Sequence, residues 1–171
     1  MTLKDALAER KPAIVQEWFE AALASYHHDA RGSLRKVKAQ FANPVGFDLA
    51  QGLDGLFDAL QRGVISDEVG TFLDAIVRIR AVQDFAPSEA LGFLLRIKQI
   101  VREVLGPALL AERGVTEALA AFDSAADDLV LYAFDLYMRC REKIYDLKAQ
   151  EARSMTFRLL QKAQMIAENQ E

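Results

Sequence analysis

The residue types best suited to chemistry in this chain are two histidines and a group of aspartates. His27 and His28 are adjacent, so on a helix they would point about 100° apart and could not both bind one metal ion. Asp123, Asp127 and Asp128 have no histidine or second acidic cluster near them in the sequence, and we interpret them as surface acids. Glycine-rich nucleotide-binding patterns and zinc-ligand spacings are missing. The sequence therefore predicts no metal, no cofactor and no enzymatic activity.

Cys140 is the single cysteine of the chain, and Arg139, Arg141 and Lys143 surround it. Neighbouring cations can activate a thiol, but no general base follows it in the sequence. We favour a small residue packed between helices over a redox or nucleophilic cysteine. One cysteine excludes an internal disulfide, and this agrees with a cytoplasmic location.

Arg80 is the candidate for binding a small ligand. Val77 and Leu73 precede it by three and seven positions, which places the arginine on the apolar stripe of its predicted helix. A partly buried arginine can bind an anion, but more often it pairs with an acid such as Asp84 or caps carbonyl groups. We favour the structural role and keep a ligand pocket near Arg80, Gln83 and Asp84 as the alternative.

The last third of the sequence predicts one very long helix. The other helices would have to pack against it, so it would position any site. Residues 116–171 contain neither glycine nor proline. Such a helix would be roughly 80 Å long, whereas the preceding residues would form a domain about 30 to 40 Å across. Part of the helix must project. We predict a body over residues 1–142 and a C-terminal extension over 143–171. The apolar residues expected to face the core are Leu119, Phe122, Ala126, Leu129, Val130, Ala133, Phe134 and Tyr137.

The extension carries a narrow apolar stripe between charged residues, which favours pairing with a second helix. We expect a parallel homodimer, although Glu151 and Ser154 interrupt a strict heptad pattern. Residues 139–162 hold seven bases and three acids, within a chain of net charge −4. These bases are either a solvated face or a surface that docks an acidic protein partner. The predicted pairing residues are Ile144, Leu147, Met155, Leu159 and Ile166, and the predicted docking residues are Arg153, Arg158 and Lys162.

The first half of the sequence predicts short amphipathic helices. Thr2 and Asp5 form a capping pair for a helix that ends near Arg10, and Pro12 begins a second helix that faces the core through Trp18. The basic segment 31–38 is expected to be a loop or a short exposed helix. It contains no interleaved aromatic residues, so nucleic-acid binding is not expected.

The middle of the chain predicts three more helices. Asn43 and Pro44 open one that stops at Gly63, and its glycines 46, 52 and 55 suggest a close crossing with another helix backbone, or less simply a gap for a ligand. Ser66 caps the next helix, over 67–83, and Pro87 begins another over 88–105. No strand signal competes and no membrane span or signal peptide is present. The fold class is all-α, with five or six helices.

Three segments resemble the RsbRD N-terminal domain family of presumed sensory domains, which are related to the RsbR co-antagonists of the bacterial stressosome. They are Phe41-Ala42-Asn43-Pro44-Val45-Gly46, then residues 52–60 (Gly-Leu-Asp-Gly-Leu-Phe-Asp-Ala-Leu), and residues 78–88 (Arg-Ile-Arg-Ala-Val-Gln-Asp-Phe-Ala-Pro-Ser). Residues 138–145 resemble the stretch that leads out of such domains. The resemblance covers residues 3–145.

The resemblance implies a globin-like, haem-free helical dimer. In RsbR-type proteins a linker helix leads on to a STAS domain that engages switch kinases, and this sequence, which stops at residue 171, lacks one. We therefore predict a stand-alone, non-enzymatic sensory module that dimerises and transmits its state through the C-terminal helix. Stand-alone members resemble proteins of sulfate-reducing bacteria. A soluble accessory protein of a Dsr-type respiratory complex and a small-ligand binding domain are the alternatives.

Overall fold

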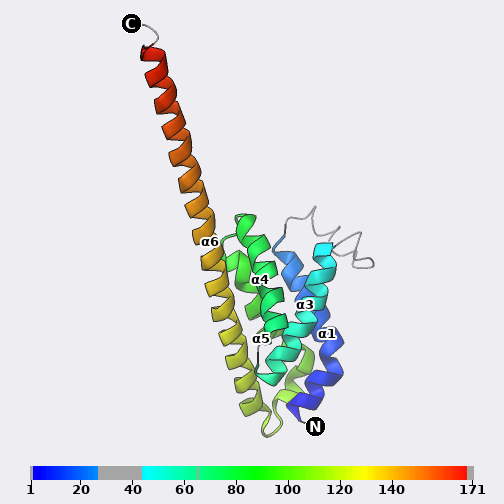
Figure 1. The fold of residues 1–171 in the computed structure, drawn as a ribbon. Helices are drawn as coiled ribbons and strands as arrows, with labels where there is room; N and C mark the ends of the chain where they lie inside the picture. The colour runs from blue at the N-terminus through cyan, green and yellow to red at the C-terminus, as the bar shows by residue number, and fades with distance from the viewer. Residues whose placement is uncertain (1, 27–43, 65, 169–171) are drawn as a thin grey trace.

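The chain folds entirely into helices over the residues that the structure describes. The computed structural model describes residues 2–26, 44–64 and 66–168, and no strand occurs within them. His27, His28, Asn43 and the basic segment 31–38 lie outside these ranges. The helices are α1 (Leu3–Ala24), α3 (Pro44–Arg62), α4 (Asp67–Val82), α5 (Pro87–Leu110) and α6 (Val115–Glu168) (Figure 1). The predicted all-α fold is confirmed.

Local capping signals set several helix ends. The Thr2 side chain accepts a hydrogen bond from the Asp5 backbone N–H, and the Asp5 carboxylate accepts one from the Thr2 N–H, which completes a capping box at α1. The Ser66 hydroxyl accepts from the Val69 N–H at the start of α4. Gly63 follows α3 with a φ of 67°, a left-handed conformation that glycine adopts without strain. These ends agree with the sequence-based prediction.

Helix α1 differs from the prediction, because it is one continuous helix and not two. Pro12 lies inside it and supplies no N–H for the intrahelical hydrogen bond. The buried residues before and after the proline occupy a single face, and they include Leu3, Leu7, Ile14 and Trp18. Burying this stripe along its whole length outweighs the local cost of the proline.

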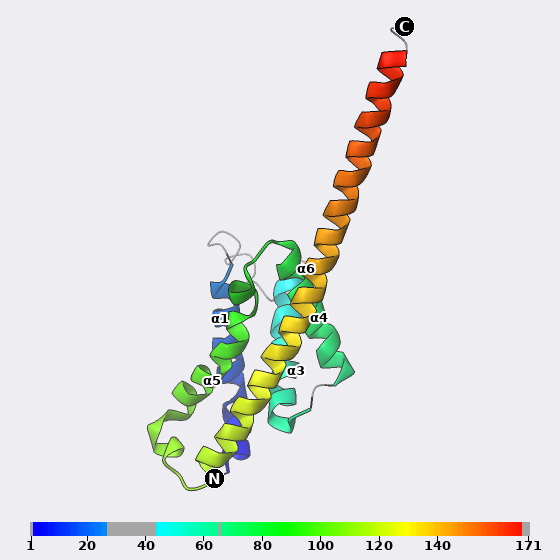
Figure 2. The same ribbon diagram turned by 90° about the vertical axis from the view of Figure 1, so that its left-hand side faces the viewer.

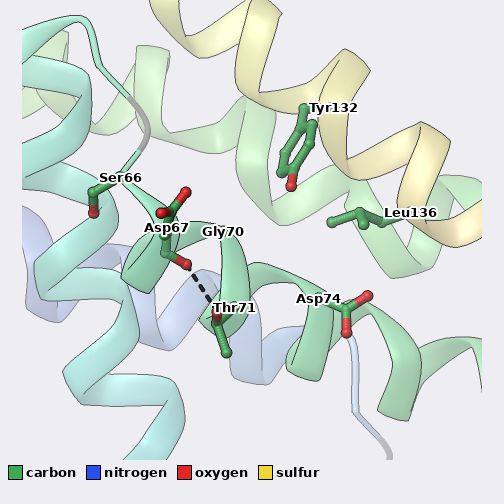
Figure 3. Close-up of a pocket in the computed structure, with 7 residues that line it drawn as sticks. All are labelled: Ser66, Asp67, Gly70, Thr71, Asp74, Tyr132 and Leu136. Atoms are coloured by element: carbon green, nitrogen blue, oxygen red, sulfur yellow. Dashed lines mark hydrogen bonds between the residues drawn. The ribbon is translucent and has the colours of Figure 1, made fainter.

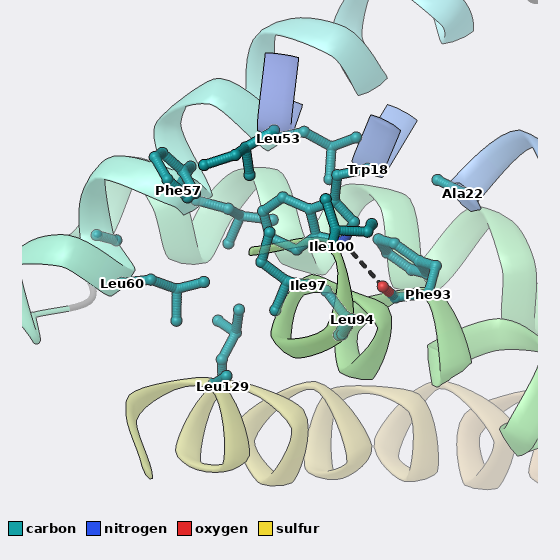
Figure 4. Close-up of a cluster of buried hydrophobic side chains, with 14 of the residues drawn as sticks. Trp18, Ala22, Leu53, Phe57, Leu60, Phe93, Leu94, Ile97, Ile100 and Leu129 are labelled. Carbon is teal, nitrogen blue, oxygen red and sulfur yellow. Dashed lines mark hydrogen bonds between the residues drawn. The ribbon is translucent and has the colours of Figure 1, made fainter. Parts of the chain in front are cut away.

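All five described helices contribute to the core, and Figure 4 shows the part where α1, α3, α5 and α6 meet. Trp18 is fully buried there, and its indole Nε1 donates a hydrogen bond to the Phe93 carbonyl at 2.8 Å. Phe57 meets Phe122 edge to face, with ring centroids 6.2 Å apart. The tryptophan thus fills the centre and fixes α1 against α5.

Gly52 of α3 allows a close approach between α3 and α4, although the approaching group is not the one predicted. A Cβ placed on Gly52 would lie 1.8 Å from the ring of Phe72. The crossing is therefore made by an aromatic side chain and not by a helix backbone. Gly55, one turn further on, faces Val69 at an ordinary contact distance of 3.8 Å.

Helix α5 contains a kink near its C-terminal end. Gly106 has φ 75° and ψ 164°, and Pro107 follows it, so the regular helix stops where the sequence predicts. A further turn runs to Leu110, and Gly114 (φ 87°) precedes α6. The long helix was predicted over residues 116–171, and it begins one residue earlier, at Val115.

Helix α6 lies along one side of the body in Figure 1 and crosses in front of the other helices in Figure 2, and in both views it continues past the body. Phe134 was expected in the core but is 43% exposed, because Leu129, Ala133, Leu136 and Tyr137 fill the buried face. Every described side chain from 145 to 165 is exposed. The projection of the helix is thus confirmed. No helix in the three described ranges combines the length and the apolarity needed to cross a membrane.

Candidate functional site: the junction between body and long helix

Arg80 lies at the meeting point of three helix ends. Its guanidinium is fully buried and donates hydrogen bonds to the carbonyls of Ala22 (3.0 Å), Glu89 (3.3 Å) and Ala90 (3.1 Å). Ala22 belongs to the last turn of α1, and the other two acceptors belong to the first turn of α5. Arg80 therefore ties the end of α4 to both of these helices, and contact with carbonyl groups is one of the two structural roles considered from the sequence.

Aromatic rings complete the surroundings of this guanidinium. Its central carbon lies 4.4 Å from the ring centroid of Phe93, 4.9 Å from that of Tyr26 and 5.7 Å from that of Phe85. Removal from water lowers the pKa of Arg80, whereas the nearby Tyr26 opposes that shift.

Asp84 does not pair with Arg80 but with Arg141 of α6. Its backbone has a φ of 58°, in the left-handed region that most residues other than glycine avoid. The Phe85 N–H bonds to the Arg80 carbonyl and the Asp84 N–H to the Ala81 carbonyl, a Schellman arrangement that ends α4. The carboxylate is thereby turned outward, and Arg141 Nη1 donates to it at 2.5 Å.

Two further hydrogen bonds hold α6 to the same turn. Arg141 donates to the Ala81 carbonyl at 3.0 Å, and the Tyr137 hydroxyl donates to the Phe85 carbonyl at 2.5 Å. The hydrogen bond from Arg141 lowers the pKa of Asp84, and that same bond raises the pKa of Arg141. We call this set of contacts the junction: Ala81, Asp84 and Phe85 on the α4–α5 turn, with Tyr137 and Arg141 on α6.

The three residues proposed as a ligand pocket do not face a common space. Arg80 points into the body, whereas Gln83 and Asp84 are exposed on the outside of the turn. The hollows described below are lined by other residues. A small ligand at Arg80, Gln83 and Asp84 stays a prediction. No local pattern indicates that Arg141, 57 positions from Asp84, contacts the α4–α5 turn.

A hollow lined by several polar side chains lies between α4 and α6, with a volume of about 540 Å³ (Figure 3). Its polar side chains already form hydrogen bonds or ion pairs within α4. Thr71 donates to the Asp67 carbonyl at 2.8 Å, and Asp74 accepts from Arg78, four residues later in α4, at 2.6 Å. The hollow is open because Gly70 has no side chain beneath Tyr132. Its lining residues are Ser66, Asp67, Gly70, Thr71, Asp74, Tyr132 and Leu136.

The other candidate residues have structural surroundings. Asp123 accepts a two-pronged ion pair from Arg102, and Asp127 pairs with Lys98 at 2.5 Å, so both link α6 to α5. Cys140 is partly buried and packs against the core. In the described ranges no three His, Cys, Asp or Glu side chains lie close enough to hold a metal ion.

The extension presents its predicted residues to solvent. Ile144 is half-buried where α6 leaves the body, and Leu147, Met155 and Leu159 are 56%, 62% and 66% exposed. Arg153, Arg158 and Lys162 are exposed on the same stretch. The side chain of Ile166 lies outside the described part. The structure brings no second helix to these residues.

Together these features define an all-helical domain whose buried arginine and outer junction connect its body to a projecting helix. The chain belongs to the family of the RsbT co-antagonist protein rsbRD N-terminal domain, whose model matches residues 12–152. This family consists of sensory and regulatory domains of the stressosome type. Neither the curated proteins nor the solved structures contain a match to this chain.

Proposed function

We propose that this chain is a non-enzymatic sensory module that forms a homodimer and passes a change in its body to a partner through α6. The observation that carries the proposal is the α4–α5 turn. On its inner side Arg80 holds α1 and α5, and on its outer side Arg141 and Tyr137 hold α6. A displacement of the end of α1 or of the start of α5 would therefore move the α4–α5 turn, to which α6 is bound. Packed helices respond to such small displacements by switching between discrete arrangements.

Hydrogen exchange tests this coupling. Arg141→Met removes the contacts to Asp84 and Ala81 while keeping an unbranched side chain. We expect faster amide exchange in the last turn of α1 and the first turn of α5, which Arg141 does not touch. Arg139→Met is the matched control, because Arg139 bonds only within its own helix, to the Asp135 carbonyl. Exchange that changes only within α6 would contradict the proposal.

The exposed bases of the extension favour docking to an acidic protein surface as a second candidate function. Family resemblance suggests a respiratory membrane complex as one such partner. Reversing Arg153, Arg158 and Lys162 to glutamate should abolish co-purification with that partner. Unchanged co-purification would remove this candidate.

A further inference from the structure

The face of α6 that is buried in the body continues past the body along the extension. Leu129, Ala133 and Leu136 are buried. Two further steps of four residues lead to Cys140, which is partly buried, and to Ile144, which is half-buried where the helix leaves the body. Steps of three or four residues follow one face of a helix, so the same face runs on into solvent (Figure 1). We call this continuation the inner stripe and define it by Ile144, Leu147, Glu151, Met155, Arg158 and Lys162.

The inner stripe combines large apolar side chains with bases. Leu147 and Met155 are exposed on it. Ile144, Leu147 and Arg158 line one open hollow along the helix, with a volume of about 540 Å³. A stripe at steps of three and four residues is as wide as one helix, so its apolar residues are suited to contact with a second helix.

The charges select the kind of helix that fits. Residues 152–167 contain three bases and no acid. Arg158 and Lys162 lie on the inner stripe, whereas Arg153 precedes Arg158 by five residues, which turns it about 140° away around the helix. Glu151 is the single acid that defines the stripe, and Lys148, three residues earlier, is placed to offset its charge. The outer end of the inner stripe is therefore positive, and it is complementary to acidic side chains.

We propose that the inner stripe docks an acidic amphipathic helix of another protein. The apolar residues of that helix pack on Leu147 and Met155. Its acidic residues pair with Arg158 and Lys162. This rests on the transmission through α6 in the proposed function, and it names the surface and the chemistry of the partner. Arg153, one of the three bases expected to dock, takes no part in this contact.

A second copy of this chain fits the inner stripe less well than an acidic helix. Two copies that met through their inner stripes would bring the same excess of bases together, which is unfavourable. The position of the stripe also suits transmission. It begins at Ile144, three residues after Arg141 of the junction. A displacement of α6 at the junction would therefore move the docked helix with it.

Peptide binding to the full chain tests the charges of this surface. The probe is a fluorescent synthetic helix of about three heptads with leucines along one face and glutamates beside them, and a second peptide has lysine in place of each glutamate. We expect the chain to bind the glutamate peptide about tenfold tighter, measured by fluorescence anisotropy. Combining Arg158→Glu with Lys162→Glu should reverse this preference. Arg139→Glu with Arg153→Glu is the matched control, because it changes the net charge equally but lies off the stripe, and it should keep the preference.

A second pair of variants tests the apolar part of the surface. Leu147→Gln should weaken binding of the glutamate peptide about tenfold, because its side chain, 56% exposed in the free chain, would be buried in the complex. Leu160→Gln is the matched control. Leu160 is 60% exposed and lies on the other side of the helix, so its loss should not change the affinity. Equal losses from the two variants would show that the peptide prefers no face of α6 and would overturn the inference.

Other results would also overturn the inference. The glutamate peptide might fail to bind, or the two peptides might bind equally. Self-association of the chain, measured by sedimentation equilibrium, that competes with the peptide and depends on Leu147 would show that a second copy covers the stripe. The hydrogen-exchange experiment with Arg141→Met is independent of these measurements. If that experiment fails while the peptide binds the stripe, the coupling in the proposed function is wrong and the docking surface stands.

Discussion

At the scale of single residues, Arg80 is the most unusual feature. A fully buried charge is costly unless hydrogen bonds compensate it, and here three carbonyls and three aromatic rings do so. The carbonyl of Ala22 lies in the last turn of α1, where it accepts hydrogen bonds from the Ser25 hydroxyl at 2.7 Å and from Arg80 at 3.0 Å. Arg80 therefore connects the end of α1 to the beginning of α5 inside the body.

Replacing Arg80 with methionine should destabilise the fold. The apolar stem is kept, but three buried carbonyls lose a donor, and we expect a loss of about 2 to 4 kcal/mol in the free energy of unfolding, measured with urea. Arg78→Met is the control, because Arg78 is exposed and pairs only with Asp74; its urea midpoint should not change. A stable Arg80→Met protein would show that the hydrogen bonds contribute little.

Gly52→Ala should destabilise the protein by about 1 to 3 kcal/mol, since the added methyl group overlaps the Phe72 ring. Gly92→Ala is the matched control. No atom lies within 4 Å of its added Cβ, so the better helix propensity of alanine should stabilise α5 by about 0.5 to 1 kcal/mol. Thermal melts of both variants check the pair. Equal melting temperatures would contradict the predicted contact.

The Asp84–Arg141 pair predicts a pH dependence. Because the hydrogen bond from Arg141 lowers the pKa of Asp84 below its ordinary 3.8, the pair stabilises the fold above that pH. The contribution is lost as the pH falls through the lowered pKa. Asp84→Asn should therefore have a lower urea midpoint than the wild type at pH 7, and the difference should vanish near pH 2. Asparagine also tolerates the left-handed backbone, so the comparison isolates the charge. A difference that is independent of pH would contradict this.

At the scale of helices, capping and periodicity predicted most of the fold. The ends at Thr2, Gly63 and Ser66 follow from local chemistry that the sequence displays directly. The break predicted at Pro12 was wrong because tertiary burial decides whether a helix passes a proline. Phe134 was misplaced because α6 is apolar around more of its circumference than its body can cover.

Pro12→Ala should stabilise the protein. The alanine restores a backbone N–H and removes the steric conflict of the ring inside α1, and Pro12 is exposed, so no core packing is lost. We expect a gain of about 1 to 2 kcal/mol in urea unfolding, reduced by the greater freedom of the unfolded chain. A loss of stability would show that the proline sets a bend that packing requires.

The candidate site was only partly predictable. The stripe through Leu73 and Val77 correctly placed Arg80 inside, because helical periodicity fixes which face a residue occupies. Its acceptors come from α1 and α5, and the partner of Asp84 comes from α6, so both depend on how helices distant in sequence pack together. No local pattern encodes those distances.

At the scale of the whole molecule, docking of the basic extension to an acidic protein predicts a response to salt. Attraction between exposed charges is screened at high ionic strength, so raising sodium chloride from 50 to 500 mM should weaken the binding of an acidic partner about tenfold or more. Co-purification of the partner across this range measures the change. Binding that does not depend on salt would contradict a docking surface made of these bases.

One consequence of the unbroken α6 concerns rotation. The helix carries no glycine or proline between body and extension, so the angular position of every later residue is fixed relative to the body. Each residue inserted after the junction would turn all that follows by about 100° and advance it by about 1.5 Å. Inserting one residue should therefore rotate the later side chains by a large angle about the helix axis. Inserting seven residues, about two full turns, should change that angle only slightly. The number of residues in the extension therefore sets both its length and the direction in which each of its side chains points relative to the body.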